Sequence, residues 1–207
     1  MYKLYGPAAS RVFRCIWTLS ETNEAFELLH LDLMKGEALK PDFLKKNPNG
    51  KVPVLEVEGQ YIFESGAICQ FIAERAISRV DLIGREGSIQ RAHILKWVYF
   101  TLSELEQPLW NIRKHTLIYP KDIRCENIID SAKIDFTRAI NTLKQSLDGS
   151  YLVSGAFSLA DIFVAQTLFW AKQVNEIDID LSFFNSYLTK LKEREGFPDI
   201  KDYLPKN

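Results

Sequence analysis

The feature that most constrains this fold is a proline at the start of a short apolar strand, within Asn47 to Leu55. Proline cannot donate in the middle of a sheet, and X-Pro bonds tolerate the cis form. We therefore expect the Val52-Pro53 peptide to be cis. A Glu-Ser pair ending at Ser65 follows, where a strand ends and a helix begins, and backbone N–H groups at a helix N-terminus bind carboxylates. These features predict a receptor for a small extended peptide with an anionic end.

The first third of the chain alternates strand and helix patterns. We expect strands at residues 3–5, 28–33, 52–57 and 60–63, with a two-residue hairpin turn at Glu58-Gly59. An apolar face predicts a helix from Ser10, a short helical turn follows at 40–44, and another helix begins at Ser65. The periodicity predicts an α/β unit with a mixed sheet.

The remaining two thirds read as helical. Residues 77–87 contain Ser, Asp, two Gly and several charges, which indicates a linker. Apolar residues recur at spacings of three and four from Ile129 to Leu147, as expected of an amphipathic helix. Pro108 predicts a kink or break in the helix that contains it. Residues 159–170 are apolar nearly all round, so we expect this helix to run through the middle of the helical half.

The sequence around Ser158 has the pattern of a helix N-cap. This serine precedes the apolar helix and Asp161 follows three residues later, which is the spacing of a capping box. Phe157 and Ile162 flank the pair at the positions of a hydrophobic staple. The cap predicts a fixed start for the central helix.

Composition excludes several classes of function. The 26 basic and 27 acidic residues nearly cancel, which argues against non-specific nucleic-acid binding. No apolar run is long enough to span a membrane, and the N-terminus has no signal-peptide pattern, so we expect a cytoplasmic protein without a membrane partner. Cys15, Cys69 and Cys125 are far apart in sequence, which fits a reducing compartment. We expect no metal site, because no CxxC motif or Cys/His cluster is present.

Four elements in order make the chain resemble the cytosolic glutathione S-transferase family, of the serine type and similar to bacterial members. They are the strand from Lys3 that leads to Ser10 and Arg11, the Val52-Pro53 step, Glu64-Ser65, and the Ser158 to Asp161 cap. The resemblance covers most of the chain. It implies a thioredoxin-like domain (βαβαββα, residues 1–77), a linker at 78–87, and an all-α helical-bundle domain at 88–207.

The resemblance implies that Ser10 activates the glutathione thiol. A cysteinyl thiol has a pKa of about 8.5, and a hydroxyl donating to sulfur beside a helix N-terminus favours the thiolate. The alternative is that Ser10 only caps its helix. Tyr5 is a rival, because some members use a tyrosine near the end of the first strand. Cys15 is another rival, although its apolar neighbours predict a buried structural thiol.

The other expected glutathione contacts also follow from the resemblance. Val52, held by Pro53, pairs its backbone with the cysteinyl backbone as an added strand would; the alternative is an ordinary trans-proline turn. Glu64 and Ser65 hold the γ-glutamyl end, unless Ser65 only caps its helix. The remaining expected contacts are cationic: Lys51 and Lys40 at the glycyl carboxylate, and Arg11 beside the thiol. Many relatives carry a histidine where this chain has Ala38, which predicts a weaker grip on the glycyl end.

The second domain is expected to line the electrophile pocket. Its candidate residues are Ser103, Gln107, Trp110 and Arg113. The histidines His30, His93 and His115 form no catalytic arrangement in the sequence pattern, so we expect them to be structural or exposed.

The sequence therefore predicts a glutathione transferase that delivers the glutathione thiolate to an electrophilic small molecule, as a homodimer. Glutathione is the co-substrate. One alternative is a non-catalytic relative that binds protein partners. Another is a glutathione-dependent disulfide reductase or peroxidase, which the lack of CxxC and the interior position of Cys15 disfavour.

Overall fold

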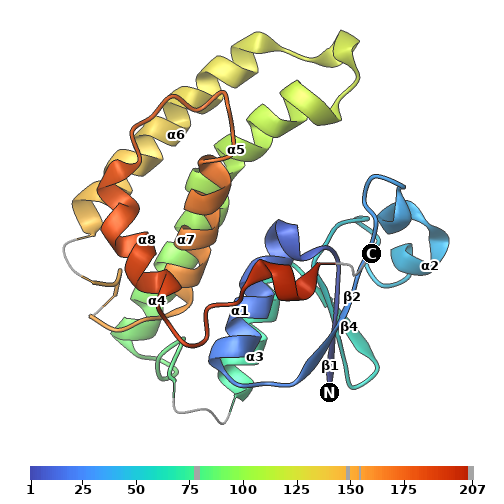
Figure 1. Cartoon of the computed structure of the whole chain (residues 1–207), viewed down its shortest axis with the longest axis vertical. Coiled ribbons are helices and arrows are strands. Elements are labelled where there is room, and N and C mark those ends of the chain that lie inside the picture. Colours follow the sequence, from blue (N-terminus) through green and yellow to red (C-terminus); the bar gives the residue numbers. More distant parts are fainter. Residues whose placement is uncertain (77–79, 148–149, 154, 205–207) are drawn as a thin grey trace. The chain divides into compact units, whose positions relative to one another are not determined.

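A computed structural model describes residues 1–76, 80–147, 150–153 and 155–204. The chain forms two compact units, one made of Met1–Ile83 together with Glu193–Asn207 and the other of Gly84–Lys192. Each unit is described by itself below. The expected fold class, a thioredoxin-like α/β half followed by a helical half, is confirmed (Figure 1).

A four-stranded mixed sheet forms the centre of the first unit. Its strands are β1 Tyr2–Tyr5, β2 Phe26–Leu29, β3 Val54–Val57 and β4 Gln60–Phe63, in the order β2-β1-β3-β4. β1 runs parallel to β2 and antiparallel to β3, and β3 forms a hairpin with β4. The hairpin turn at Glu58 and Gly59 has positive φ at both residues, as a tight two-residue turn requires.

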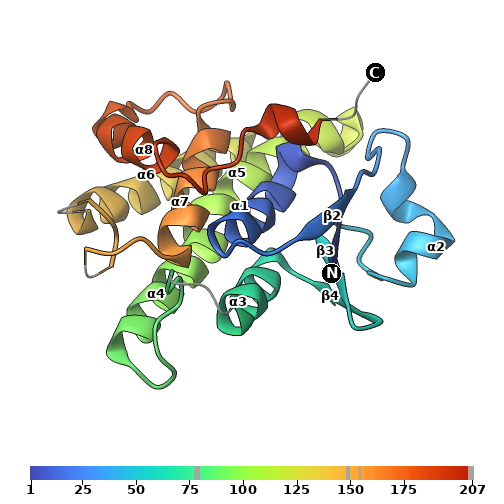
Figure 2. The ribbon, with the colours of Figure 1, turned by 60° about the horizontal axis from the view of Figure 1, so that its bottom comes forward.

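One face of this sheet is covered by two helices, α1 Phe13–Glu21 and α3 Ser65–Arg75. Strand alternation directs Leu4 and Leu55 to this face, and both are fully buried. The views in Figures 1 and 2 agree that α1 and α3 lie side by side on the same side of the sheet. Because apolar burial is the main stabilising term in folding, this layer is the core of the first unit.

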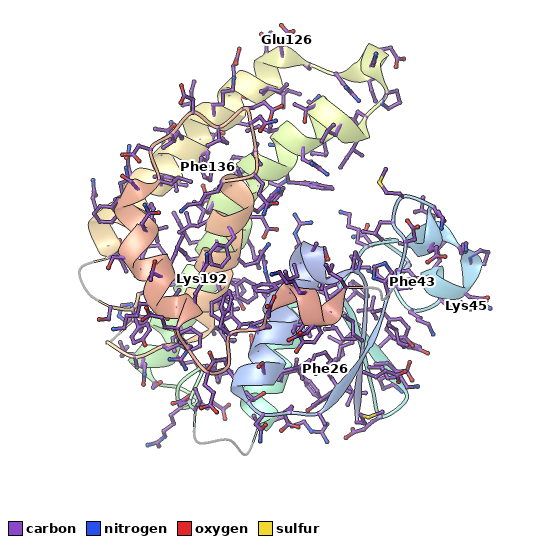
Figure 3. The ribbon with its side chains drawn as sticks, viewed as in Figure 1. Phe26, Phe43, Lys45, Glu126, Phe136 and Lys192 are labelled. Carbon is purple, nitrogen blue, oxygen red and sulfur yellow. The ribbon has the colours of Figure 1, made fainter. Side chains whose placement is uncertain are left out.

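The opposite face carries a smaller cover made by the segment between β2 and β3. This segment contains the turn η2 Glu37–Leu39 and the short helix α2 Pro41–Leu44. Phe43 lies between α2 and the sheet (Figure 3) and packs with Ala38 and Val54 in a small cluster. The Phe43 ring meets Tyr5 edge-on at 6.3 Å between centroids. The cluster fixes the loop that leads into β3.

Several element boundaries differ from the sequence expectation, and three of them have a clear physical reason. β2 ends at Leu29 rather than at residue 33, because the Asp32 carboxylate accepts from the N–H groups of Met34 and Lys35 and bends the chain there. β3 begins after Pro53, since proline has no N–H for the ladder. The regular helix α1 begins at Phe13, after an irregular turn.

The second unit consists of helices. Their bounds are α4 Ile89–Phe100, η3 Thr101–Leu105, α5 Glu106–Arg113, η4 Lys114–Ile118, η5 Lys121–Ile123, α6 Glu126–Ser146, α7 Leu159–Ala171, η6 Ser182–Phe184 and α8 Asn185–Lys192. α7 is buried on almost every side and packs against α4, η3 and α8, so the expected central helix is confirmed. Phe136 of α6 (Figure 3) is fully buried, which confirms the amphipathic pattern of that helix.

The helix around Pro108 is interrupted as expected. A wide π-type turn, Thr101–Leu105, joins α4 to α5 just before the proline. Proline lacks an N–H and its ring clashes with the carbonyl four residues earlier, here that of Glu104. The wider turn removes that clash, so α5 continues through Pro108. Within the described residues, no helix is both long and apolar enough to cross a membrane.

The C-terminal segment packs on the first unit, whereas the sequence-based boundary assigned it to the helical domain. Arg194 makes two hydrogen bonds of 2.7 and 2.6 Å to Glu21, which also accepts from Trp17 Nε1 at 3.0 Å. Phe197 packs edge-on against Trp17, at 4.9 Å between centroids. The helical turn η7 Ile200–Tyr203 then contacts the turn that precedes α1. Side-chain pairing over a long sequence separation therefore sets this boundary.

The expected linker is only partly a solvent-exposed connection. Residues 77–79 lie outside the described residues. Leu82 and Ile83, which follow them, are buried and belong to the first unit. Their apolar side chains explain why the first unit extends to residue 83.

Replacing Arg194 with alanine should lower the free energy of unfolding by about 2 kcal/mol, because the buried Glu21 carboxylate loses its guanidinium partner. Thermal unfolding followed by circular dichroism measures this loss. Arg138→Ala is the matched control, since Arg138 forms an exposed pair with Asp135 at 3.5 Å and such pairs contribute little. Equal melting temperatures for the two variants would show that Arg194 does not hold this segment.

Candidate functional site

Three strand ends meet at one edge of the sheet in the first unit. The register pairs Tyr5 with Val54, and Val54 with Phe63. The C-terminal ends of β1 and β4 therefore lie beside the N-terminal end of β3. The turn that follows β1, the loop that enters β3 and the helix α3 that follows β4 all start from this edge. These are the segments that carry the expected peptide site.

The Val52-Pro53 peptide is cis, which confirms that expectation. No backbone hydrogen bond joins Val52 to another residue that the structure describes, so its N–H and carbonyl are available to an extended ligand. Gly6 has a φ of 126° and lies against the Val52 side chain, where an added Cβ would sit 2.8 Å from the Val52 Cβ. Only glycine allows this approach, which places the turn after β1 next to Val52.

Ser10 lies in that turn, η1 Ala8–Val12, at a residue with extended backbone. Its hydroxyl donates to the Pro7 carbonyl at 2.7 Å and accepts from the Val12 N–H at 3.2 Å. Ser10 therefore does cap the start of the helical segment. A cap that accepts from a backbone N–H has a more polarised hydroxyl, so capping and donation to a ligand are compatible. Arg11, the next residue, is half-buried beside it.

Glu64 and Ser65 occupy the start of α3. Glu64 has a φ of 69°, in the left-handed region that non-glycine residues rarely adopt. Its side chain is exposed, whereas Ser65 is only 4% exposed. α3 begins without a side-chain cap, and the first N–H groups of a helix have no intrahelical partner. Such groups form an anion-binding position.

The two lysines expected near the glycyl end are exposed and lie in the loop before β3. The Lys51 carbonyl accepts from Asn47 Nδ2 at 2.7 Å, which fixes the backbone just before Val52. Lys40 pairs with Glu37 at 3.4 Å. Ala38 is buried in the cluster around Phe43. Both lysines expected at the glycyl end are therefore exposed side chains.

The Tyr5 hydroxyl already makes a hydrogen bond to a carboxylate of the protein. It donates to Glu56, which also pairs with Lys3 at 3.1 Å. Burial raises the pKa of Tyr5, and the hydrogen bond to Glu56 raises it further. A tyrosine whose proton is held by a carboxylate is a poor donor to a thiolate, so the geometry favours Ser10 over Tyr5.

Replacing Tyr5 with phenylalanine should therefore leave the pKa of a bound ligand thiol within about 0.3 units of the parent value, since an effect that small is below about 0.5 kcal/mol. Ultraviolet titration of the thiolate measures this. A rise of one unit or more would return the thiol-activating role to Tyr5.

Cys15 is inaccessible, which disfavours it as a reactive thiol. It is fully buried and its sulfur lies 3.8 Å from the sulfur of Cys69, in α3. Burial raises the pKa of the Cys15 thiol, so it stays protonated and unreactive. The cysteines are all free thiols. Among the residues the structure describes, no group of three or more potential ligands could hold a metal ion.

The four candidate electrophile contacts belong to the second unit, along η3 and α5. Ser103 donates to the Tyr99 carbonyl at 3.0 Å. Spacings of four and three place Ser103, Gln107 and Trp110 on one helix face, and Arg113 follows one turn later. All four side chains are at least partly exposed. Their grouping on one face is compatible with a pocket wall.

The histidines are exposed or make a structural contact. His30 and His93 are exposed. His115 is largely buried and its Nδ1 accepts from the Cys125 N–H at 3.1 Å, which is a structural contact at the start of α6.

One site residue was missed by sequence reasoning. Arg14 is fully buried in α1, and its Nη1 donates to Ser65 Oγ at 3.3 Å. The signal was present in the sequence, because an arginine interrupts an otherwise apolar helix face between Phe13 and Trp17. A buried arginine needs a polar partner, and such a partner lies at the start of α3.

Comparison with known proteins agrees with this geometry. Residues 1–74 match the model of the glutathione S-transferase N-terminal domain. Glutathione S-transferase F9 of Arabidopsis thaliana is 33% identical over 168 residues, which cover 77% of this chain and 76% of the relative. Glutathione S-transferase GstA of Escherichia coli is 26% identical over 207 residues, covering 99% of this chain and 97% of the relative.

A solved structure is similar over the full length. The crystal structure of glutathione transferase F7 from Populus trichocarpa superposes with a TM-score of 0.82 at 26% identity, covering all of both chains. The similarity thus includes both the half with the strand-edge site and the helical half.

Proposed function

Because this chain belongs to the glutathione S-transferase family, we propose that its strand-edge site binds glutathione and that Ser10 activates the thiol for transfer to an electrophilic small molecule. The observation that carries the proposal is the Ser10 hydroxyl, polarised by the Val12 N–H. It lies in the turn after β1, whose Gly6 packs against Val52, a residue with no backbone hydrogen bond among the described residues. The transferase activity follows from the family; the residue roles are our assignment.

Ser10 acts on the sulfur through its proton. In the ligand-free protein this proton is held by the Pro7 carbonyl. When glutathione binds, rotation of the hydroxyl directs it to the sulfur and stabilises the thiolate. A shift of about two pKa units corresponds to roughly 2.7 kcal/mol, which is within the range of one charge-assisted hydrogen bond from the Ser10 hydroxyl to the thiolate.

The peptide ends are held by the other residues of the same edge. Val52, next to Pro53, pairs with the cysteinyl backbone as an added strand. Ser65 offers its N–H and hydroxyl to the γ-glutamyl carboxylate, and Glu64 accepts from the γ-glutamyl ammonium. Weaker contributions come from three cations: Lys51 and Lys40 near the glycyl carboxylate, and Arg11 near the sulfur.

The electrophile binds to residues of the helical half. We assign Ser103, Gln107, Trp110 and Arg113 to its binding. The reaction forms a sulfur–carbon bond in one of two ways. A leaving group departs with its electron pair, or the π bond of an activated double bond breaks and its other carbon takes up a proton. Such chemistry removes reactive electrophiles, and the free thiols of Cys15 and Cys69 fit a cytoplasmic location.

Retention on immobilised glutathione, followed by turnover of chlorodinitrobenzene with free glutathione, tests the proposal. We expect elution by free glutathione and formation of the aryl conjugate. A protein that is retained but inactive against a panel of aryl halides, enones and peroxides would be a binding module. A protein that is not retained would remove glutathione from the account.

We also propose a symmetric homodimer in which the first domain of one subunit meets the helical domain of the other. Large apolar side chains are exposed on both units, among them Leu39 and Phe63 in the first and Ile134 in the second, and such surface favours association. A permanent isologous interface needs about 2,000 Å² or more. Sedimentation at micromolar concentration should give twice the 23.9 kDa chain mass; a single-chain mass would overturn this proposal.

A further inference from the structure

A buried arginine, Arg14, donates a hydrogen bond to the residue that begins α3. Arg14 extends from α1 and is fully buried, and its Nη1 donates to Ser65 Oγ at 3.3 Å. Ser65 itself is 4% exposed and is the first residue of α3. The hydrogen bond therefore joins the helix that follows Ser10 to the helix start where the γ-glutamyl carboxylate is expected.

The direction of this hydrogen bond determines what Ser65 can offer a ligand. A guanidinium group has donors only, so Ser65 Oγ must be the acceptor. Within the described part of the chain, the Ser65 hydroxyl donates to no other group. Its proton therefore remains free, and the polarising donor behind it makes that proton a stronger donor.

We propose that Arg14 is a positioning residue for the carboxylate of the γ-glutamyl group. It holds Ser65 so that the hydroxyl proton and the first N–H groups of α3 converge on the carboxylate oxygens. This inference rests on the proposed glutathione site and adds a residue that acts on the ligand only through Ser65.

A purely structural role explains the pair less well. α1 and α3 already pack against each other: the sulfurs of Cys15 and Cys69 lie 3.8 Å apart. Ile16 of α1 and Ile68 and Ile72 of α3 are fully buried. An apolar side chain at position 14 would serve such packing without the cost of burying a charge. A donor aimed at the ligand-facing hydroxyl supplies what packing does not, namely a fixed orientation of that hydroxyl.

Arg14→Lys tests the assignment because it keeps the positive charge but shortens the side chain by one atom, which takes the nitrogen out of hydrogen-bond reach of Ser65. We expect glutathione to bind about tenfold more weakly by titration calorimetry, equivalent to the loss of one charge-assisted hydrogen bond. A glutathione analogue whose γ-glutamyl α-carboxylate is replaced by a carboxamide should bind parent and variant within about twofold of each other, since such a difference is under 0.5 kcal/mol. Arg75→Lys, in the exposed pair with Glu58 at the other end of α3, is the matched control and should bind as the parent does.

A double-mutant cycle tests whether Arg14 affects glutathione binding through Ser65. In a Ser65→Ala background, Arg14→Lys should cause no further loss, because the two residues act as one unit. Arg14→Met, which removes the charge as well, supplies a second variant if the lysine protein is unstable. Any one of three results would overturn the positioning role of Arg14. A folded Arg14 variant could bind glutathione as the parent does, or it could lose equal affinity for glutathione and for the carboxamide. The effects of Arg14→Lys and Ser65→Ala could also be fully additive. A parent protein that binds no glutathione would overturn the proposed function and this inference together, whereas the other outcomes leave the function standing.

Discussion

Replacing Asp161 with alanine is expected to lower the free energy of unfolding by about 4 kcal/mol. The carboxylate is fully buried and accepts four hydrogen bonds: from the Leu152 N–H at 3.0 Å, the Tyr187 hydroxyl at 2.9 Å, and the Ser158 N–H and hydroxyl at 2.9 and 3.2 Å. Alanine leaves these donors buried without a partner. The expected capping box is thus confirmed, and the structure adds Tyr187 and Leu152 to it.

The loss would show as a drop in melting temperature of about 10 °C, a large share of a typical total stability of about 5–15 kcal/mol. Tyr187→Phe removes one of the four donors and should cost only about 1 kcal/mol. Asp135→Ala, on the exposed side of α6, is the matched control. Turnover of the protein that does fold should stay near normal. A variant that melts like the parent but loses glutathione-dependent activity would place Asp161 in the active site.

Replacing Ser10 with alanine is expected to reduce turnover about 25-fold at pH 7. If the hydroxyl lowers the thiol pKa from about 8.5 to about 6.5, the thiolate fraction falls from about three-quarters to about 3% when it is removed. The affinity for glutathione should change little, because the hydroxyl contacts the sulfur and not the peptide ends. The deficit should also shrink as the pH rises from about 6.5 and nearly disappear above about 8.5, where the unassisted thiol ionises by itself.

A pH profile of turnover for parent and Ser10→Ala measures this difference. Ser20→Ala, at the other end of α1, is the matched control for the same side-chain change on the same helix. A deficit that stays constant from pH 6 to pH 9 would contradict thiol activation and would indicate that Ser10 only supports the local fold. A matching loss of stability of about 1 kcal/mol is expected in either case, since the Val12 N–H loses its cap.

Local patterns predicted several structural features of the strand edge, because these features are encoded within short segments. Pro53 marks the start of a strand by its missing N–H, and Ser65 marks a helix start through its position after a strand. The same holds for Ser158 and Asp161, whose spacing of three residues is fixed by helix geometry. Such signals need no knowledge of distant contacts.

Features that depend on distant partners were not predicted. The pairing of Arg194 with Glu21 spans most of the chain, and nothing near either residue indicates it. Arg14 could have been suspected from its apolar neighbours, but its partner Ser65 lies 51 residues away. The hydrogen bond from Tyr5 to Glu56 depends on the β1–β3 register, which places these two side chains on one face of the sheet.

The central claim is that the strand-edge site lowers the pKa of the glutathione thiol through Ser10. The most direct test is a titration of the thiolate absorbance near the ultraviolet edge for glutathione bound to the parent protein, with Ser10→Ala titrated beside it. The account predicts a thiol pKa of about 6.5 in the parent complex and a return toward about 8.5 in the variant. A bound thiol that titrates near 8.5 in the parent, or at the same pH in both proteins, would contradict it.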